Sequence, residues 1–300
     1  MADGILLAIL AALAFGAALV VTQRGLAHQS AYAGARISIL TTALLLWLPA
    51  PWAFDARVLS SPALAMFAGV GLFFPLLVTL LTFEANRIMG PTLAGTLGSV
   101  APLLSLTAAV LFLGEGVTAR IAGAALAVTA GIALLSLQRA AQPQHWPLAA
   151  LALPLAAAAL RAGAQAWIKA GLALVPSAYT AALTGYTVSA LAVWLLALPG
   201  GRLVQAGGWL PRFVAGRPGA AFSLRGGAWF MAAGVLNGSA VLAMYGALSQ
   251  TGLAIVAPIV ATYPVATLLL SAGLLRTERI GARRAAGCLL VVAGMVLILA

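Results

Sequence analysis

The residues best able to do chemistry lie on one apolar stretch, LPLAAAALRAGAQAWIKAGLA, at positions 153–173. Arg161, Gln165 and Lys169 follow one another at four-residue spacing, which places them on one face of a helix. An arginine at the centre of a lipid-embedded helix costs about 2.5–3.5 kcal/mol on insertion scales. This polar face is therefore expected to look onto protein or water and not onto lipid.

Two interpretations of Arg161 stay open. The guanidinium could be structural, held in an ion pair or by hydrogen bonds to neighbouring carbonyls. It could instead bind an anionic group of a substrate, because its planar fork fits a carboxylate or phosphate with two parallel hydrogen bonds. Lys169 is expected near a helix end, where an ammonium usually reaches toward the membrane interface. For Lys169, substrate binding is the alternative.

The five acidic residues lie mostly in predicted loops or at predicted helix starts. Glu84 alone closes a predicted span, and it is a candidate proton-coupling carboxylate or counter-ion of Arg161. A solvated or locally paired side chain is the simpler interpretation of Glu84. Glu115 and Glu278 precede predicted helices, where a carboxylate meets the positive end of the helix dipole. Without an acid at mid-membrane, a facilitator or exchanger stays open beside a proton-coupled carrier.

Composition identifies lipid as the main solvent of this chain. Of its 300 residues, 63% are hydrophobic and 7% are charged, which no soluble domain of this size could bury. The net charge of +11 is spread over short loops, so we expect no nucleic-acid binding. Clusters of His, Cys and acidic residues are lacking, so the sequence predicts neither a metal site, a cofactor nor a catalytic nucleophile, and the protein is not expected to be an enzyme.

Apolar runs of about 20 residues predict an all-α, polytopic membrane protein, because helices satisfy their own backbone hydrogen bonds in lipid. The predicted fold has ten transmembrane helices. They cover residues 4–23, 32–50, 63–83, 91–113, 117–137, 147–169, 177–198, 227–249, 253–275 and 280–299.

The two halves of the chain resemble each other. Phe83, Gly90 and Pro102 recur as Tyr245, Gly252 and Pro264, each 162 positions later. We therefore predict one five-helix repeat in residues 1–138, a connecting loop at 139–146 and a second repeat in 147–300. Because five is odd, the second repeat enters the membrane inverted. Inverted repeats favour alternating access to a central site, which indicates a carrier.

Several ordered motifs carry a resemblance to a known family. They are Gly34-Ala35-Arg36, then Asn86-Arg87, Ala94, Pro102, Leu113-Gly114-Glu115, Gly123 and Gly131. With these motifs the whole chain resembles the EamA-like, ten-helix branch of the drug/metabolite transporter superfamily. The resemblance implies carriage of small metabolites such as amino acids, often as export. The chain departs from the family where members carry Trp-Gly or Trp-Ser, since it has Phe15-Gly16 and Arg161-Ala162 there.

Further polar and aromatic residues are candidate walls of the central site. Asn237 lies between Gly234 and Gly238, where close helix packing is the alternative to ligand contact. Pro102 and Pro264 occupy equivalent positions inside two predicted helices, and each is a candidate hinge. The remaining candidates for substrate binding are Phe15, Ser99, Tyr245 and Tyr263, with Tyr186 and Trp167 as further wall residues.

The basic residues predict the orientation. Of the 16 Lys and Arg, twelve lie on the side opposite the termini and three on the terminal side, with Arg161 inside a span. Positive residues favour the cytoplasm, so both termini are predicted to be non-cytoplasmic. The familiar ten-helix relatives usually keep theirs inside.

Together these patterns predict a secondary transporter of the cytoplasmic (inner) membrane. Its substrate would be a small anionic or zwitterionic metabolite whose acidic group binds Arg161. The alternatives are a carrier or flippase of lipid-linked or hydrophobic compounds on the same fold, and a non-transporting scaffold or sensor. The expected partners are the lipid bilayer and a small-molecule substrate, and a homodimer is left open.

Overall fold

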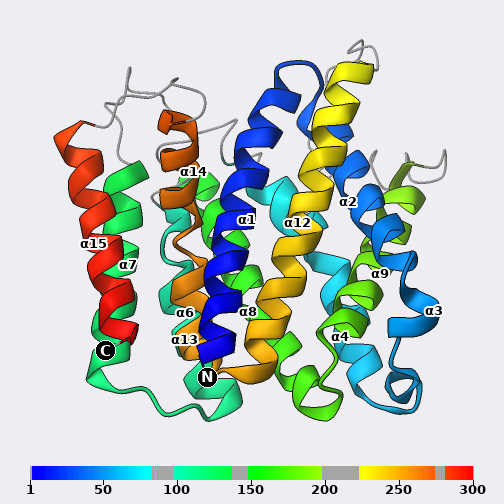
Figure 1. The fold of residues 1–300 in the computed structure, drawn as a ribbon, viewed down its shortest axis with the longest axis horizontal. Helices are drawn as coiled ribbons and strands as arrows, with labels where there is room; N and C mark the ends of the chain where they lie inside the picture. Colours follow the sequence, from blue (N-terminus) through cyan, green and yellow to red (C-terminus); the bar gives the residue numbers. More distant parts are fainter. Residues whose placement is uncertain are drawn as a thin grey trace.

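Helices joined by short turns make up the part of the chain that the computed structural model describes, namely residues 2–82, 85, 97–136, 148–197, 223–273 and 281–299 (Figure 1). No strand occurs within these ranges. In chain order the elements are α1 (Ala2–Leu26), α2 (Ala31–Trp47), α3 (Ala50–Ala53), η1 (Ala56–Ser60), α4 (Ala63–Phe73), α6 (Ala101–Leu113), α7 (Ala119–Ser136), η2 (Leu148–Leu151), α8 (Ala152–Leu174), α9 (Ala178–Ala197), α12 (Leu224–Gln250), α13 (Leu253–Val260), α14 (Tyr263–Gly273) and α15 (Ala282–Leu299).

The lengths and compositions of these helices suit a bilayer. Among the described residues, seven helices are long and apolar enough to cross a membrane, and two shorter apolar helices accompany them. The helix α8 has 23 residues, about 34 Å at 1.5 Å per residue, which exceeds the hydrocarbon thickness of about 30 Å. It is not among the seven because Arg161, Gln165 and Lys169 lower its hydropathy. The protein is a polytopic, all-α membrane protein, as predicted.

Each predicted span corresponds to a helix or to a pair of consecutive helices, so far as its residues are described. The prediction for the sixth span was wrong at its end, since α8 continues to Leu174 and not only to position 169. Three predicted spans are interrupted, at Phe74–Pro75, at Ser99–Val100 and at Ala261–Thr262. Glu84 lies outside the described residues. So do the other parts of the predicted spans and loops at 83–84, 86–96, 137–147, 198–222 and 274–280.

The first interruption follows from a proline. In an unbroken helix the Gly71 carbonyl would accept the backbone N–H of residue 75, but Pro75 has none. That carbonyl instead accepts a hydrogen bond from Ser189 Oγ of α9 at 2.8 Å. A Cβ added at Gly71 would lie 2.4 Å from the Gly185 carbonyl oxygen, so α4 and α9 approach closely at this point.

The interruptions at Ser99–Val100 and Ala261–Thr262 correct the placement of the two candidate hinge prolines. Pro102 and Pro264 are not inside continuous helices, since each is the second residue of a new one, α6 and α14. Proline suits the first helical turn, where its missing N–H would have no partner. At the second break Thr262 Oγ1 donates to the Ile259 carbonyl at 2.7 Å, which satisfies one of the last carbonyls of α13.

The packing of the helices forms a central group and a lateral pair. Helices α7 and α15 lie side by side at one edge of the molecule (Figure 1). Glycines allow this contact: a Cβ at Gly131 would lie 2.8 Å from the Gly287 carbonyl oxygen, and one at Gly294 would lie 2.9 Å from that of Ala124. Gly131, Gly287 and Gly294 therefore serve close packing.

The contacts of the central group follow a two-sided pattern. Helix α12 packs on α1 and α2, and α4 packs on α8 and α9. Likewise α13 and α14 pack on α1, and α6 packs on α8. The contacts of α12, α13 and α14 with the first helices of the chain thus match those of α4 and α6 with α8 and α9. This arrangement places α8, with its polar face, between α4, α6, α12 and α13.

Candidate functional site

Gln165 holds the middle of the polar face of α8. Its side chain is buried, and its Oε1 accepts a hydrogen bond from Ser105 Oγ of α6 at 2.9 Å. Its Nε2 donates to Met244 Sδ of α12 at 3.7 Å. A single amide thus joins three helices, since a buried amide needs partners for both its donor and its acceptor.

Arg161 lies one turn of α8 away from Gln165, on the same face and about 6 Å along the helix axis. Its side chain is half-buried. No other described residue forms a hydrogen bond or an ion pair with the Arg161 guanidinium, and the one ion pair between described residues is that of Arg57 with Asp55. A half-buried cation without a partner among the described residues can accept an anionic group with little rearrangement.

A hydroxyl-bearing layer crosses the centre of the molecule beside these residues. Tyr245 of α12 and Tyr186 of α9 are buried and lie near enough to interact electrostatically. The Tyr186 hydroxyl also interacts with the Thr42 hydroxyl of α2, which donates to the Gly234 carbonyl of α12 at 2.7 Å. Tyr245 directly follows Met244, the α12 partner of Gln165.

Phe15 and Tyr263, both predicted wall residues, contact each other. Their ring centroids are 6.4 Å apart with an interplanar angle of 61°. The close approach of α1 and α14 allows this contact, because a Cβ at Gly16 would lie 3.0 Å from the Tyr263 carbonyl oxygen. This pair belongs to the α1–α14 contact, and no described contact joins it to Gln165.

The other predicted residues lie apart from these groups. Ser99 is buried in the turn that precedes α6. Asn237 is half-buried on α12, and its side chain makes no hydrogen bond to a described residue. The flanking Gly234 allows close helix packing, because a Cβ there would lie 2.6 Å from the Ser38 carbonyl oxygen of α2. Trp167 stacks on Phe73 of α4 and is 47% exposed.

Lys169 occupies a different environment from the one its sequence position indicates. Helix α8 extends five residues beyond Lys169, and the ammonium is engaged by another helix. Lys169 Nζ donates to the carbonyls of Leu248 at 2.6 Å and Thr251 at 3.0 Å. These groups belong to the C-terminal end of α12, where carbonyls lack helical partners and a cation is favourable.

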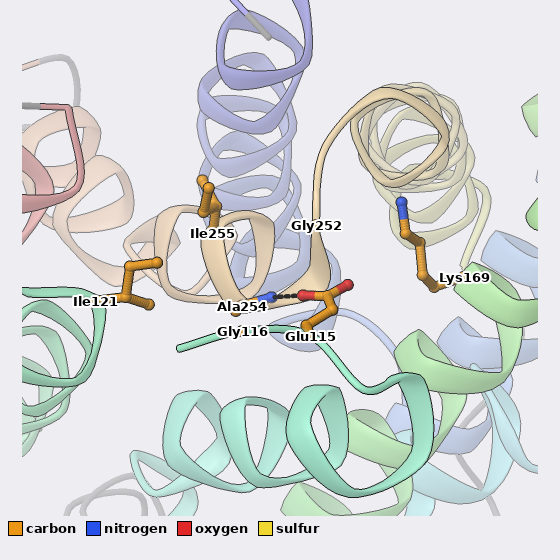
Figure 2. A pocket seen from close by; sticks show the side chains of 7 residues that line it. All are labelled: Glu115, Gly116, Ile121, Lys169, Gly252, Ala254 and Ile255. Atoms are coloured by element: carbon orange, nitrogen blue, oxygen red, sulfur yellow. Dashed lines mark hydrogen bonds between the residues drawn. The ribbon is translucent and has the colours of Figure 1, made fainter. Parts of the chain in front are cut away.

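Glu115 also has another role than the predicted one. It does not serve the helix that follows it, α7, but accepts hydrogen bonds from the backbone N–H groups of Leu253 at 2.7 Å and Ala254 at 2.8 Å. Those groups begin α13, whose N-cap Gly252 has no side chain to cap it. A cavity of about 300 Å³ adjoins this contact (Figure 2). Its lining residues are Glu115, Gly116, Ile121, Lys169, Gly252, Ala254 and Ile255.

Sequence reasoning did not select Thr42, Ser105 and Met244, and it named Glu115 only as a helix-start acid. The first three lie inside apolar spans. Their position well within a span was the signal that could have identified them. Their partners lie 192, 60 and 79 positions away, so no local pattern shows the contacts.

The fold and this polar centre define a class of protein. It is a multi-pass membrane protein in which hydrogen-bonded polar groups lie between helices from both halves of the chain. Residues 2–137 match the model of the EamA-like transporter family, the family that the motifs of the sequence resemble. A solved crystal structure of a protein is similar over 99% of this chain and 96% of that chain, with a TM-score of 0.76 and 16% sequence identity. That likeness shows the fold alone. No curated protein matches the chain.

Proposed function

We propose that this transporter moves a small anionic or zwitterionic metabolite, similar to an amino acid in size and charge, across the cytoplasmic membrane by alternating access. Export is the direction that the family resemblance favours. Arg161 binds the acidic group of the substrate. Gln165, Tyr245 and Tyr186 wall the site beside it.

The observation that carries this proposal is the contrast along one face of α8. Gln165 and Lys169 are both engaged by neighbouring helices, whereas the guanidinium of Arg161 has no partner among the described residues. A structural arginine at this depth would be expected to pair with an acid or with carbonyls, because an uncompensated buried charge is costly. A carboxylate supplied by a substrate provides the missing partner.

The alternating-access mechanism is supported by the two-sided packing. We propose that residues 1–138 and 147–300 are repeats inserted in opposite orientations, since each contact between α1 or α2 and the second half has its counterpart between α8 or α9 and the first half. Exchanging the conformations of two such repeats exposes a central site to either side of the membrane in turn.

Flux of organic acids into proteoliposomes tests the proposal. Arg161→Ala should reduce the uptake of a transported carboxylate about tenfold or more, because a charge-assisted hydrogen bond contributes about 1.5–3 kcal/mol. Arg161→Lys should retain part of the uptake, since the charge remains but the planar fork is lost. Arg120→Ala, which removes an exposed arginine on the terminal side, is the matched control and should leave uptake unchanged.

Equal uptake of every tested acid by the Arg161→Ala and parent proteins would reject the proposed role. Movement of lipid-linked phosphates alone, dependent on Arg161, would favour the flippase alternative on the same fold.

A further inference from the structure

The junction between α12 and α13 is held from outside by two side chains of opposite charge. Thr251 and Gly252 separate the end of α12 from the start of α13, on the terminal side of the molecule. The Lys169 ammonium binds the carbonyls at the end of α12, and the Glu115 carboxylate binds the N–H groups at the start of α13. Each charge thus meets the helix end of opposite polarity. We call Glu115, Lys169 and this junction the clasp.

The clasp joins the two halves of the chain. Glu115 follows α6 in the first half, whereas α8, α12 and α13 belong to the second half. Figure 2 shows the Glu115 carboxylate at the start of α13, with Lys169 across the Gly252 segment. The two charged groups are near enough for mutual attraction. Any separation of the halves at the terminal side must therefore break the two backbone hydrogen bonds of Glu115.

The local backbone aims Glu115 at its partners. Helix α6 ends at Leu113, and its C-cap Gly114 has a φ of 63°, a left-handed conformation that favours glycine. The Glu115 N–H donates to the Ala109 carbonyl at 3.0 Å, which fixes the start of the segment. At the other side, a Cβ on Gly252 would lie only 2.8 Å from Glu115 Oε2. The contact as it stands therefore favours glycine at both positions.

The clasp lies between the central residues and the terminal surface. Lys169 follows Arg161 by eight residues on the same face of α8, about 12 Å nearer to that surface. Next to the clasp is the cavity of about 300 Å³, and a Cβ at Gly116 would meet no atom within 4 Å. The carboxylate accordingly has space into which it can move when its bonds break, unlike a cap packed on all sides.

We infer that the clasp is the terminal-side gate of the central site, and that it is closed in this structure. This inference rests on the proposed alternating-access function. When the gate is closed, Glu115 ties the first half of the chain to α13 while Lys169 holds α12. When it opens, the carboxylate leaves the start of α13 and water reaches Gln165 and Arg161 from the terminal side.

Cysteine accessibility tests the gate without any transported substrate. The reporter is Met244→Cys, a buried position beside Gln165, in a Cys288→Ser background so that it carries the only thiol. A membrane-impermeant maleimide is added on the terminal side of the reconstituted protein. Glu115→Gln removes the charge and one acceptor oxygen, and Gly252→Ala displaces the carboxylate without changing any charge.

Both exchanges should raise the labelling rate from the terminal side about tenfold or more, which corresponds to the loss of one charge-assisted hydrogen bond. Labelling from the opposite side should not rise, whereas a generally loosened protein would label faster from both sides. Two matched controls should label like the parent: Gly116→Ala, which adds a methyl group in open space of the same cavity, and Asp55→Asn, which removes the charge of a carboxylate paired with Arg57 on the same side.

Parental labelling rates in both folded variants would overturn the gate, and so would equal increases from both sides. Size-exclusion chromatography shows whether each variant is folded. Glu115→Asp withdraws the carboxylate by one methylene and replaces any variant that does not fold. It should raise the labelling rate from the terminal side by the same factor. If Arg161 proves irrelevant to flux while labelling responds as described, the proposed substrate falls and the gate stands. If flux depends on Arg161 but labelling does not respond, the gate falls alone.

Discussion

At the residue scale, the polar face of α8 distributes its three polar groups over three tasks. Gln165 connects helices through hydrogen bonds, Lys169 satisfies the end of α12, and Arg161 keeps its guanidinium without a partner among the described residues. A charge in the membrane interior is normally paired or placed beside water. The division of tasks along one face is therefore the reason to assign the substrate to Arg161 and the structural roles to the other two.

The hydrogen bond between Ser105 and Gln165 should be measurable as a coupling. Ser105→Ala and Gln165→Leu each remove one partner, and the double variant removes both. Because hydrogen bonds between membrane helices contribute about 0.6 kcal/mol on average, with a maximum of about 1.7, we expect a coupling free energy within that range. Unfolding of the four proteins in detergent and lipid micelles measures it, and strictly additive effects would contradict the contact.

The sequence predicted which side chains share a face but not what they contact. Four-residue spacing is a local property, so the amino-acid order alone groups Arg161, Gln165 and Lys169. Their partners come from helices far along the chain, and Glu115 was assigned to the wrong helix for the same reason. A carboxylate before a helix is usually interpreted as a cap of that helix, but here the vacant N-terminus of α13 lies within its reach.

At the element scale, the hydrophobic runs located the spans, whereas their interruptions were not predicted. Apolar residues continue through Phe74–Pro75 and Ala261–Thr262, so hydropathy alone indicates one helix at each place. The breaks depend on carbonyls that find side-chain donors, such as Gly71 with Ser189 and Ile259 with Thr262. Both breaks lie inside a predicted span, where side-chain donors satisfy backbone carbonyls.

Helix α7 offers a matched test of the close packing of α7 and α15. Gly131→Ala places a methyl group 2.6 Å from Val291 Cγ2, and we expect it to destabilise the protein by about 1–3 kcal/mol through overpacking. Gly123→Ala lies on the same helix in open space and should be neutral or stabilising by up to about 1 kcal/mol, since alanine favours helices. Thermal unfolding compares them, and equal melting temperatures would contradict the assigned contact.

At the scale of the whole molecule, both termini lie at the same end (Figure 1). This arrangement agrees with an even number of crossings. It also gathers the clasp, Asp55, Arg57 and Arg120 at the end with fewer basic residues. The described arginines of the opposite end include Arg24, Arg225, Arg283 and Arg284. We propose that this opposite end faces the cytoplasm, as the distribution of basic residues favours.

A reporter fused to the C-terminus tests this orientation. An alkaline phosphatase fusion should be active, because that enzyme matures outside the cytoplasm, and a green fluorescent protein fusion should be dark. The opposite pair of results would reverse the orientation and would place the clasp at the cytoplasmic side.

The most direct measurement is a thermal-stabilisation screen of the solubilised protein with a library of small organic acids, amino acids and neutral analogues, run in parallel on the Arg161→Ala variant. We expect that some carboxylates raise the melting temperature of the parent protein, that their neutral amides do not, and that Arg161→Ala abolishes the effect. Stabilisation by neutral analogues, or by the same acids with Arg161 removed, would contradict the assignment of Arg161 as the binding site for an acidic group.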